Sequence, residues 1–171
     1  QGIYMVSGVA ADRFYGNFVA SNASAQMYLS GNNVSCTGNI TCTGTLQGLY
    51  LTGSNIRVFN HMAYGLGTSN NDVYYIKESG SGCSLDNCTA ILSGAGTAGN
   101  AFNITAASVS LSNCYAGSNR SLSGYRIAAN GVTLTNCRAE SSGWYGYYLA
   151  AADNCTLQDC SSSEDSKAGF L

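Results

Sequence analysis

A short apolar motif recurs along the whole chain, and its spacing constrains the fold more than any other feature. Each copy ends in an aliphatic residue that lies two positions after another apolar residue, and successive copies are 22 to 28 residues apart. Self-similarity at such a period is the signature of a solenoid, in which each repeat buries its apolar face against its neighbours. The copies end at Met5, Leu29, Leu51, Ile76, Ile104, Ile127 and Leu149.

A second element follows each copy of the motif and alternates apolar with polar residues, which is typical of strands that bury one face. Its copies are Val34–Cys36, Ile56–Val58, Cys83–Leu85, Val109–Leu111, Val132–Leu134 and Cys155–Leu157, with Val9–Ala11 as a weaker first copy. A third short strand follows, as in Cys88–Ala90, Cys114–Ala116 and Cys137–Ala139. No segment has a helical pattern. The sequence therefore predicts an all-β parallel β-helix of about seven coils of 22 to 28 residues, with three short strands in each coil.

An asparagine or aspartate followed by cysteine marks the bend between the second and third strands. These cysteines are Cys88, Cys114, Cys137 and Cys160. Asn and Asp tolerate left-handed backbone, and stacked amides can hydrogen-bond from coil to coil. Packing of a small apolar side chain explains why cysteine occupies this slot, so we expect mostly free thiols. The sequence contains no C-x-x-C pair, so we predict no metal site.

The first three coils depart from this pattern. We assign Phe14, Asn39 and His61 to the cysteine slot there, with Arg13 and Gly38 at the preceding bend position. We interpret His61 as a packed or bend residue rather than as a catalytic base.

The bend motif, Leu-x-Asn/Asp-Cys, occurs at Leu85–Cys88, Leu111–Cys114, Leu134–Cys137 and Leu157–Cys160. It resembles the right-handed parallel β-helix proteins of the pectate-lyase-like superfamily, whose members commonly carry asparagine ladders, and it also resembles the rods of phage tail spikes and fibres. The resemblance covers nearly the whole chain and implies one β-helix domain over residues 1–171. Both ends stop inside a repeat without a polar cap, so we expect a segment of a longer chain or a cap from another domain or subunit.

Charge and hydropathy exclude two classes of partner. Only 9% of the residues are charged, the formal net charge is -2, and the basic residues are scattered singly. No basic patch can neutralise a phosphate backbone, so nucleic acid is not an expected partner. No apolar run is long enough for membrane insertion, and no motif indicates a cofactor.

The residues between the two apolar positions of the first strand face outward. In chain order this outward column is Tyr4, Tyr28, Tyr50, Tyr75, Asn103, Arg126 and Tyr148. Its tyrosines and Arg126 are the candidate binding or interface residues. Aromatic rings in one line suit contact with the sugar rings of a cell-surface polysaccharide. An interface between identical chains, most simply a homotrimer around a threefold axis, suits them somewhat better, because a single regular seam fits symmetric assembly.

The acidic residues offer only a weak catalytic site. Glycosidases need two carboxyl groups across the scissile bond, and lyases need a base. Glu140 and Glu164 follow equivalent cysteines by three and four residues, so they could lie side by side on successive coils. Ordinary solvated loop acids explain these two residues better, and we expect no polysaccharide-degrading activity that depends on this segment.

Three functions remain open from the sequence. The first is a structural or glycan-contacting rod of a virion appendage, such as a phage tail spike or fibre. The second is a polysaccharide lyase or glycoside hydrolase of the β-helix superfamily, and the third is a bacterial surface adhesin. The first and third predict an extracellular or virion-surface location.

Overall fold

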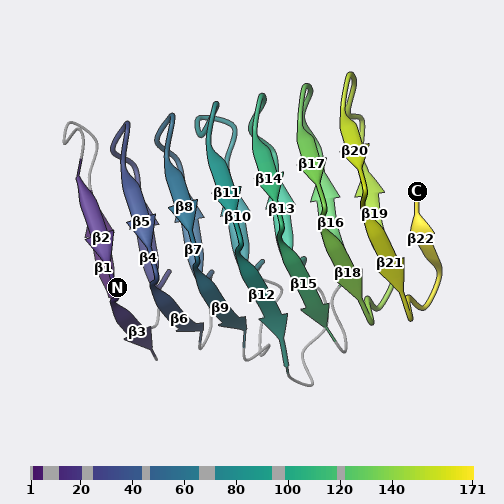
Figure 1. Cartoon of the computed structure of the whole chain (residues 1–171), viewed down its shortest axis with the longest axis horizontal. Coiled ribbons are helices and arrows are strands. Elements are labelled where there is room, and N and C mark those ends of the chain that lie inside the picture. The colour runs from purple at the N-terminus through teal and green to yellow at the C-terminus, as the bar shows by residue number, and fades with distance from the viewer. Residues whose placement is uncertain are drawn as a thin grey trace.

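The computed structural model describes residues 2–5, 12–20, 25–43, 47–65, 72–93, 99–118 and 122–171. These residues form seven consecutive triplets of short strands and one last strand. The triplets follow one another along the long axis of the molecule, with the two termini at opposite ends (Figure 1). Within this part of the chain, no helix is long and apolar enough to span a membrane.

The strands form three parallel sheets, one from each position in the triplet. Sheet 1 contains β1 (Ile3–Met5), β4 (Met27–Leu29), β7 (Leu49–Leu51), β10 (Tyr74–Ile76), β13 (Phe102–Ile104), β16 (Ser123–Ile127), β19 (Tyr145–Leu149) and β22 (Ala168–Phe170). Sheet 2 contains β2 (Arg13–Tyr15), β5 (Ser35–Thr37), β8 (Arg57–Phe59), β11 (Ser84–Asp86), β14 (Ser110–Ser112), β17 (Thr133–Thr135) and β20 (Thr156–Gln158). Sheet 3 contains β3 (Phe18–Ala20), β6 (Ile40–Thr43), β9 (Met62–Gly65), β12 (Thr89–Leu92), β15 (Tyr115–Ser118), β18 (Arg138–Glu140) and β21 (Ser161–Ser163). The predicted all-β solenoid with three strands per coil is confirmed.

The first coil differs from the prediction. Strand pairing places Phe14 opposite Cys36, so the first copy of the second element is β2, and residues 9–11 lie outside the described part of the chain. Phe18 pairs with Ile40, which puts Asn17 rather than Phe14 beside Asn39 in the cysteine slot. Both the backbone N–H and the side-chain Nδ2 of Asn17 donate to Oδ1 of Asn39, at 2.9 and 2.8 Å.

Glycine, not arginine, occupies the bend of the first coil. Gly16 has φ +60° and Gly38 has φ +64°, the left-handed backbone that glycine adopts without steric cost. Arg13 lies on β2 instead. The assignment of Arg13 to the bend was wrong because Phe14 fits the apolar slots of the second strand and of the cysteine column equally well.

The predicted asparagine bends are confirmed in the later coils. Asn60, Asn87, Asn113, Asn136 and Asp159 all have φ between 51° and 53°. Their amides form a ladder only in part, because Nδ2 of Asn87 donates to Oδ1 of Asn60 and Nδ2 of Asn136 donates to Oδ1 of Asn113. Between these pairs, the Asp86 carboxylate accepts from Asn113 at 2.8 Å. The Asp86 carboxylate therefore stabilises the bend at Asn113.

A stack of aromatic rings fills the core, on the inner face of sheet 1. Tyr74, Phe102, Tyr125 and Tyr147 are fully buried, and their successive ring centroids are 4.6 to 4.8 Å apart with nearly parallel planes. The spacing is that of neighbouring strands, so each ring packs on the next coil. The buried hydroxyls are satisfied, because Tyr125 donates to the carbonyl of Cys114 at 2.7 Å and Tyr147 to that of Cys137 at 2.6 Å.

All eight cysteines are free thiols, as the sequence predicts. Five are buried and three are partly exposed. Burial raises the pKa of Cys36 to about 12 and that of Cys83 to about 11, so both stay protonated at neutral pH. The buried cysteines act as small packing residues.

Candidate functional site

The outward residues of sheet 1 lie in one continuous line, as the sequence predicts. Strand pairing aligns Tyr4, Tyr28, Tyr50 and Tyr75, which we call the tyrosine column. Ring centroids along it are 4.8, 5.0 and 5.1 Å apart. Every ring therefore touches the next, and the column is one aromatic surface that spans four coils.

The rings of the tyrosine column form two stacked pairs. Tyr4 and Tyr28 are within 21° of parallel, Tyr50 and Tyr75 within 6°, and the two pairs meet at 79°. Stacking covers the ring faces within each pair, so the column presents mainly ring edges and hydroxyl groups to the outside. Tyr4 is 49% exposed, and the other three are partly exposed.

Polar neighbours interact with the hydroxyls of Tyr28 and Tyr50. Thr52 Oγ1 donates to the Tyr28 hydroxyl at 3.3 Å. Partial burial raises the pKa of the Tyr50 hydroxyl above its ordinary value, and the nearby ammonium group of Lys77 partly offsets the effect. The Tyr50 hydroxyl is therefore a neutral donor and acceptor at physiological pH.

The outward line continues beyond the tyrosine column as a polar chain. Tyr75 pairs with Asn103, and Asn103 pairs with Arg126. The Asp72 carboxylate accepts hydrogen bonds from Asn103 Nδ2 at 2.7 Å and from the backbone and side chain of Asn100. Asn103 in turn accepts from Arg126 Nη1 at 3.0 Å. The partly buried amide of Asn103, itself held by the Asp72 carboxylate, thus fixes the position of the guanidinium group.

A second aromatic group lies at the other end of this line. Arg126 pairs with Tyr148, whose ring lies 5.5 Å from that of Tyr145. Lys167 Nζ lies 3.8 Å from the centre of the Trp144 ring, which is 47% exposed. Along the axis, the outer face of sheet 1 therefore has an aromatic surface at the tyrosine column, a polar surface at Asn103 and Arg126, and a second aromatic surface around Tyr148.

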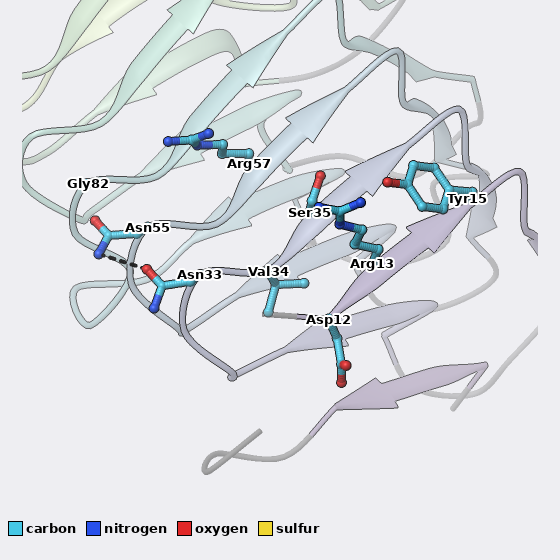
Figure 2. A pocket seen from close by; sticks show the side chains of 9 residues that line it. All are labelled: Asp12, Arg13, Tyr15, Asn33, Val34, Ser35, Asn55, Arg57 and Gly82. Atoms are coloured by element: carbon cyan, nitrogen blue, oxygen red, sulfur yellow. Dashed lines mark hydrogen bonds between the residues drawn. The ribbon is translucent and has the colours of Figure 1, made fainter. Parts of the chain in front are cut away.

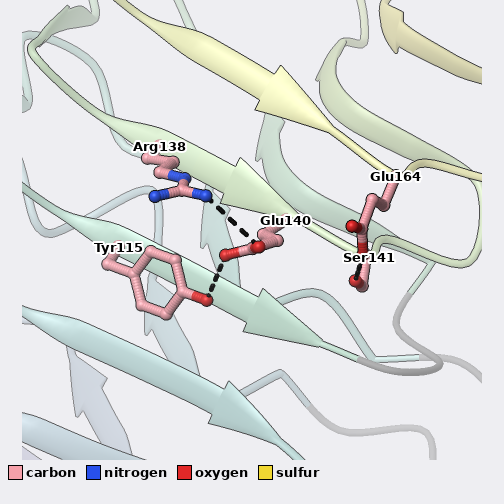
Figure 3. A network of polar contacts seen from close by, with 5 residues as sticks. All are labelled: Tyr115, Arg138, Glu140, Ser141 and Glu164. Carbon is pink, nitrogen blue, oxygen red and sulfur yellow. Dashed lines mark hydrogen bonds and ion pairs between the residues drawn. The ribbon is translucent and has the colours of Figure 1, made fainter.

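The two candidate acids lie on neighbouring coils but contact different partners (Figure 3). Glu140 pairs in register with Ser163, one position before Glu164. Its carboxylate accepts from the Tyr115 hydroxyl at 2.7 Å and lies 3.2 Å from Arg138 Nη2. The hydrogen bond to Glu140 raises the pKa of the Tyr115 hydroxyl.

Glu164 is a bend residue. Its backbone is left-handed, with φ 59°, and its Oε2 accepts from Ser141 Oγ at 2.9 Å. The Glu140 carboxylate faces Tyr115 and Arg138, whereas the Glu164 carboxylate faces Ser141 (Figure 3).

His61 is a packed core residue. It is 1% exposed, and its Nδ1 lies 2.6 Å from the Tyr74 hydroxyl. Burial lowers the pKa of the imidazole to about 3. The ring is neutral at physiological pH, and its buried position prevents a role as a base towards external substrate.

A groove on sheet 2 was not predicted from the sequence (Figure 2). It has a volume of about 750 Å³. Arg13 and Arg57 flank Ser35 across three neighbouring strands, and Tyr15, Asn33 and Asn55 also line the groove. We call it the arginine groove.

Among the described residues, no three His, Cys, Asp or Glu side chains gather into a cluster that could bind a metal ion.

No family model and no curated protein sequence match this chain. Solved structures do match it. The crystal structure of pectate lyase Pel9A superimposes with a TM-score of 0.69 over 80% of this chain, at 17% sequence identity. The fold is that of the parallel β-helix.

The periplasmic alginate epimerase AlgG gives a similar result, with a TM-score of 0.68 over 99% of the chain at 11% identity. The chain spans only 39% and 42% of the lengths of these two proteins. At such identity the likeness shows a shared β-helix fold.

Proposed function

We propose that this chain is a polysaccharide-contacting segment of a β-helix and that the outer face of sheet 1 is its contact surface. The observation that carries the proposal is the tyrosine column, in which four rings touch one another across four coils. By contrast, the outward positions of sheet 2 are mostly occupied by Ser and Thr.

The geometry of the tyrosine column favours lateral contact along a sugar chain. Hydroxyl groups recur at each coil, about 4.8 Å apart, so a linear polymer laid along the axis would meet a donor and acceptor at every coil. Arg126, held by Asn103, adds a fixed cation further along the same line. Pectate lyase Pel9A and alginate epimerase AlgG are named for polysaccharides, which supports the same class of partner.

Two settings fit a surface of this kind. A rod of a virion appendage and a bacterial surface adhesin would both be extracellular and would both meet cell-surface polysaccharide. The contact requires no catalytic carboxylates, and the contacts of Glu140 and Glu164 favour binding over cleavage.

An interface between identical chains is the second candidate role for the tyrosine column. The regular register across β1, β4, β7 and β10 favours it, because a straight line of equivalent residues can meet its own copy around a symmetry axis. A homotrimer is the simplest such assembly for a rod.

The test replaces Tyr28, Tyr50 and Tyr75 together with Ser. Their rings face outward, so circular dichroism should show unchanged β-structure. Affinity electrophoresis through gels that contain individual polysaccharides should show a loss of retention of at least about tenfold, given the usual worth of several aromatic contacts. The matched control replaces two exposed aromatic residues on other sheets, Phe18→Ser and Phe59→Ser, and should be retained like the wild type.

Sedimentation of the same variants separates the two roles. Loss of polysaccharide retention without a change in mass supports the proposal. A wild-type trimer that dissociates in the triple variant, with retention unaffected in either form, would assign the tyrosine column to assembly instead.

A further inference from the structure

The arginine groove lies on sheet 2, away from the tyrosine column. Arg13 pairs with Ser35, and Ser35 pairs with Arg57, so the two arginines stand on either side of a small hydroxyl side chain. Two strand spacings separate their backbones by about 10 Å. Figure 2 shows Ser35 between them on the middle strand.

Neither arginine has an ion-pair partner in the part of the chain that the structure describes. Within the described residues, the one salt bridge joins Arg138 to Glu140 on sheet 3. Arg13 and Arg57 are both exposed and make no hydrogen bond to another described side chain. Asp12 also lines the groove, so two guanidinium groups and one carboxylate leave a net positive charge there. The rest of the chain carries a net negative charge.

The other groups in the groove are neutral and polar, with one aromatic ring. Asn55 Nδ2 donates to Asn33 Oδ1 at 3.4 Å, which leaves Nδ2 of Asn33 free to donate to a ligand. Tyr15 is 57% exposed at one side of the groove. Hydroxyl, amide and aromatic groups together are the usual partners of a sugar.

We propose that the arginine groove binds an acidic saccharide, with its acid group held between Arg13 and Arg57. Guanidinium groups form charge-assisted, often bidentate hydrogen bonds with planar acid groups, and Ser35 supplies a donor at the floor. Asn33 and Tyr15 then contact the sugar hydroxyls and ring. A volume of about 750 Å³ is within the usual range of small-ligand sites and accommodates a short oligosaccharide.

A phosphate backbone fits this groove less well. Nucleic-acid binding needs a line of several basic residues that release counterions together. Here two arginines share the groove with Asp12, and the remaining outward positions of sheet 2 carry no further basic residue in the described part of the chain.

The experiment uses fluorescently labelled dextran oligomers of one length in three forms: neutral, carboxymethylated and sulfated. Fluorescence polarisation should show that the wild-type chain binds an acidic form and not the neutral form. The two acidic forms show which acid group the groove prefers. The double variant Arg13→Gln, Arg57→Gln should weaken this binding by at least about tenfold.

Two control variants make the result specific. Arg138→Gln removes the same charge from sheet 3 and should leave binding unchanged. The Tyr28, Tyr50 and Tyr75 to Ser variant should also retain it, because this site does not depend on the proposed function of sheet 1. Equal binding of neutral and acidic oligomers, unchanged binding by the double variant, or an equal loss in either control would overturn the proposal.

Discussion

Nδ1 of His61 lies 2.6 Å from the hydroxyl oxygen of Tyr74, inside the stack of coils. The Tyr74 hydroxyl also lies 2.9 Å from the carbonyl oxygen of His61 and 3.1 Å from that of Thr89. Carbonyl oxygens only accept, so the hydroxyl can donate to one of them while Nδ1–H of the imidazole donates to the hydroxyl. Nε2 is then left buried without a partner, in a neutral ring.

This arrangement predicts that acid destabilises the protein through its single histidine. The folded-state pKa of His61 is about 3, whereas the unfolded chain has the ordinary value of about 6.5. As the pH falls, the unfolded chain binds the proton first. Stability is therefore full above pH 6.5 and falls steadily towards pH 3, with a loss of about 2 kcal/mol between pH 7 and pH 5. Urea unfolding at these two pH values measures it.

The matched control for His61 is the variant His61→Cys, which places the residue of the later coils in the same slot. Its unfolding free energy should change much less between pH 7 and pH 5. An equal loss in both proteins would assign the pH dependence to other groups.

The inner aromatic stack predicts a large effect of Phe102→Ala. Phe102 is fully buried between the rings of Tyr74 and Tyr125, at 4.6 and 4.8 Å. Removing the ring leaves a cavity with a stacked neighbour missing on each side, so the free energy of unfolding should fall by about 3–5 kcal/mol. Denaturant unfolding monitored by circular dichroism gives this value.

Tyr125→Phe in the same stack should cost far less, about 1 kcal/mol. It removes only the hydroxyl, and the carbonyl of Cys114 keeps its hydrogen bond from the backbone N–H of Arg138. If both substitutions had similar costs, the stacking would not be the source of the stability.

The burial of the cysteines predicts that fewer thiols react in the native protein than in the denatured protein. Under denaturing conditions all eight should react with a thiol reagent. In the native protein the five buried thiols should be protected, leaving Cys42, Cys155 and Cys160 as the reactive ones. Recovery of four disulfides after denaturation would contradict the packing role of the cysteine column.

Gly53→Ala should destabilise the fold by steric overlap. A Cβ atom at Gly53 would overlap the backbone carbonyl of Gly31 on the preceding coil, which cannot move without disturbing the stack. We expect a loss of about 1–3 kcal/mol or more. Gly38→Ala is a useful comparison, because open space surrounds its Cβ position and only the left-handed backbone is strained, at about 1–2 kcal/mol.

Much of the fold could be predicted because each strand needs only a local period-two pattern. The tyrosine column was placed correctly for the same reason, since Tyr4, Tyr28, Tyr50 and Tyr75 sit between inward residues whose spacing sets the register. The prediction failed for the first coil because Phe14 fits both the apolar slot of the second strand and the cysteine slot. Only the pairing of β3 with β6 shows that Asn17 continues the cysteine slot.

The rest of the candidate surface depends on three-dimensional detail that no local pattern carries. Arg13 and Arg57 are two coils apart in sequence, and only strand pairing places them on either side of Ser35. The 79° angle between the Tyr28 and Tyr50 rings reflects the packing of side chains, which a local sequence pattern does not specify. The contacts of Glu140 likewise come from neighbouring strands.

The contacts of Glu140 predict a structural role for its carboxylate. Its carboxylate joins Arg138 on its own strand to Tyr115 on the preceding coil. Glu140→Gln retains an acceptor for the Tyr115 hydroxyl and loses only a partly exposed ion pair, so unfolding free energy should fall by no more than about 1 kcal/mol. Glu164→Gln should be similarly mild, since the amide oxygen can still accept from Ser141. The wild type and both variants are incubated with pectate and alginate and assayed for new reducing ends and unsaturated products. We expect no cleavage activity that is present in the wild type and lost in either variant. Cleavage lost in Glu140→Gln at unchanged stability would instead make this carboxylate a catalytic group.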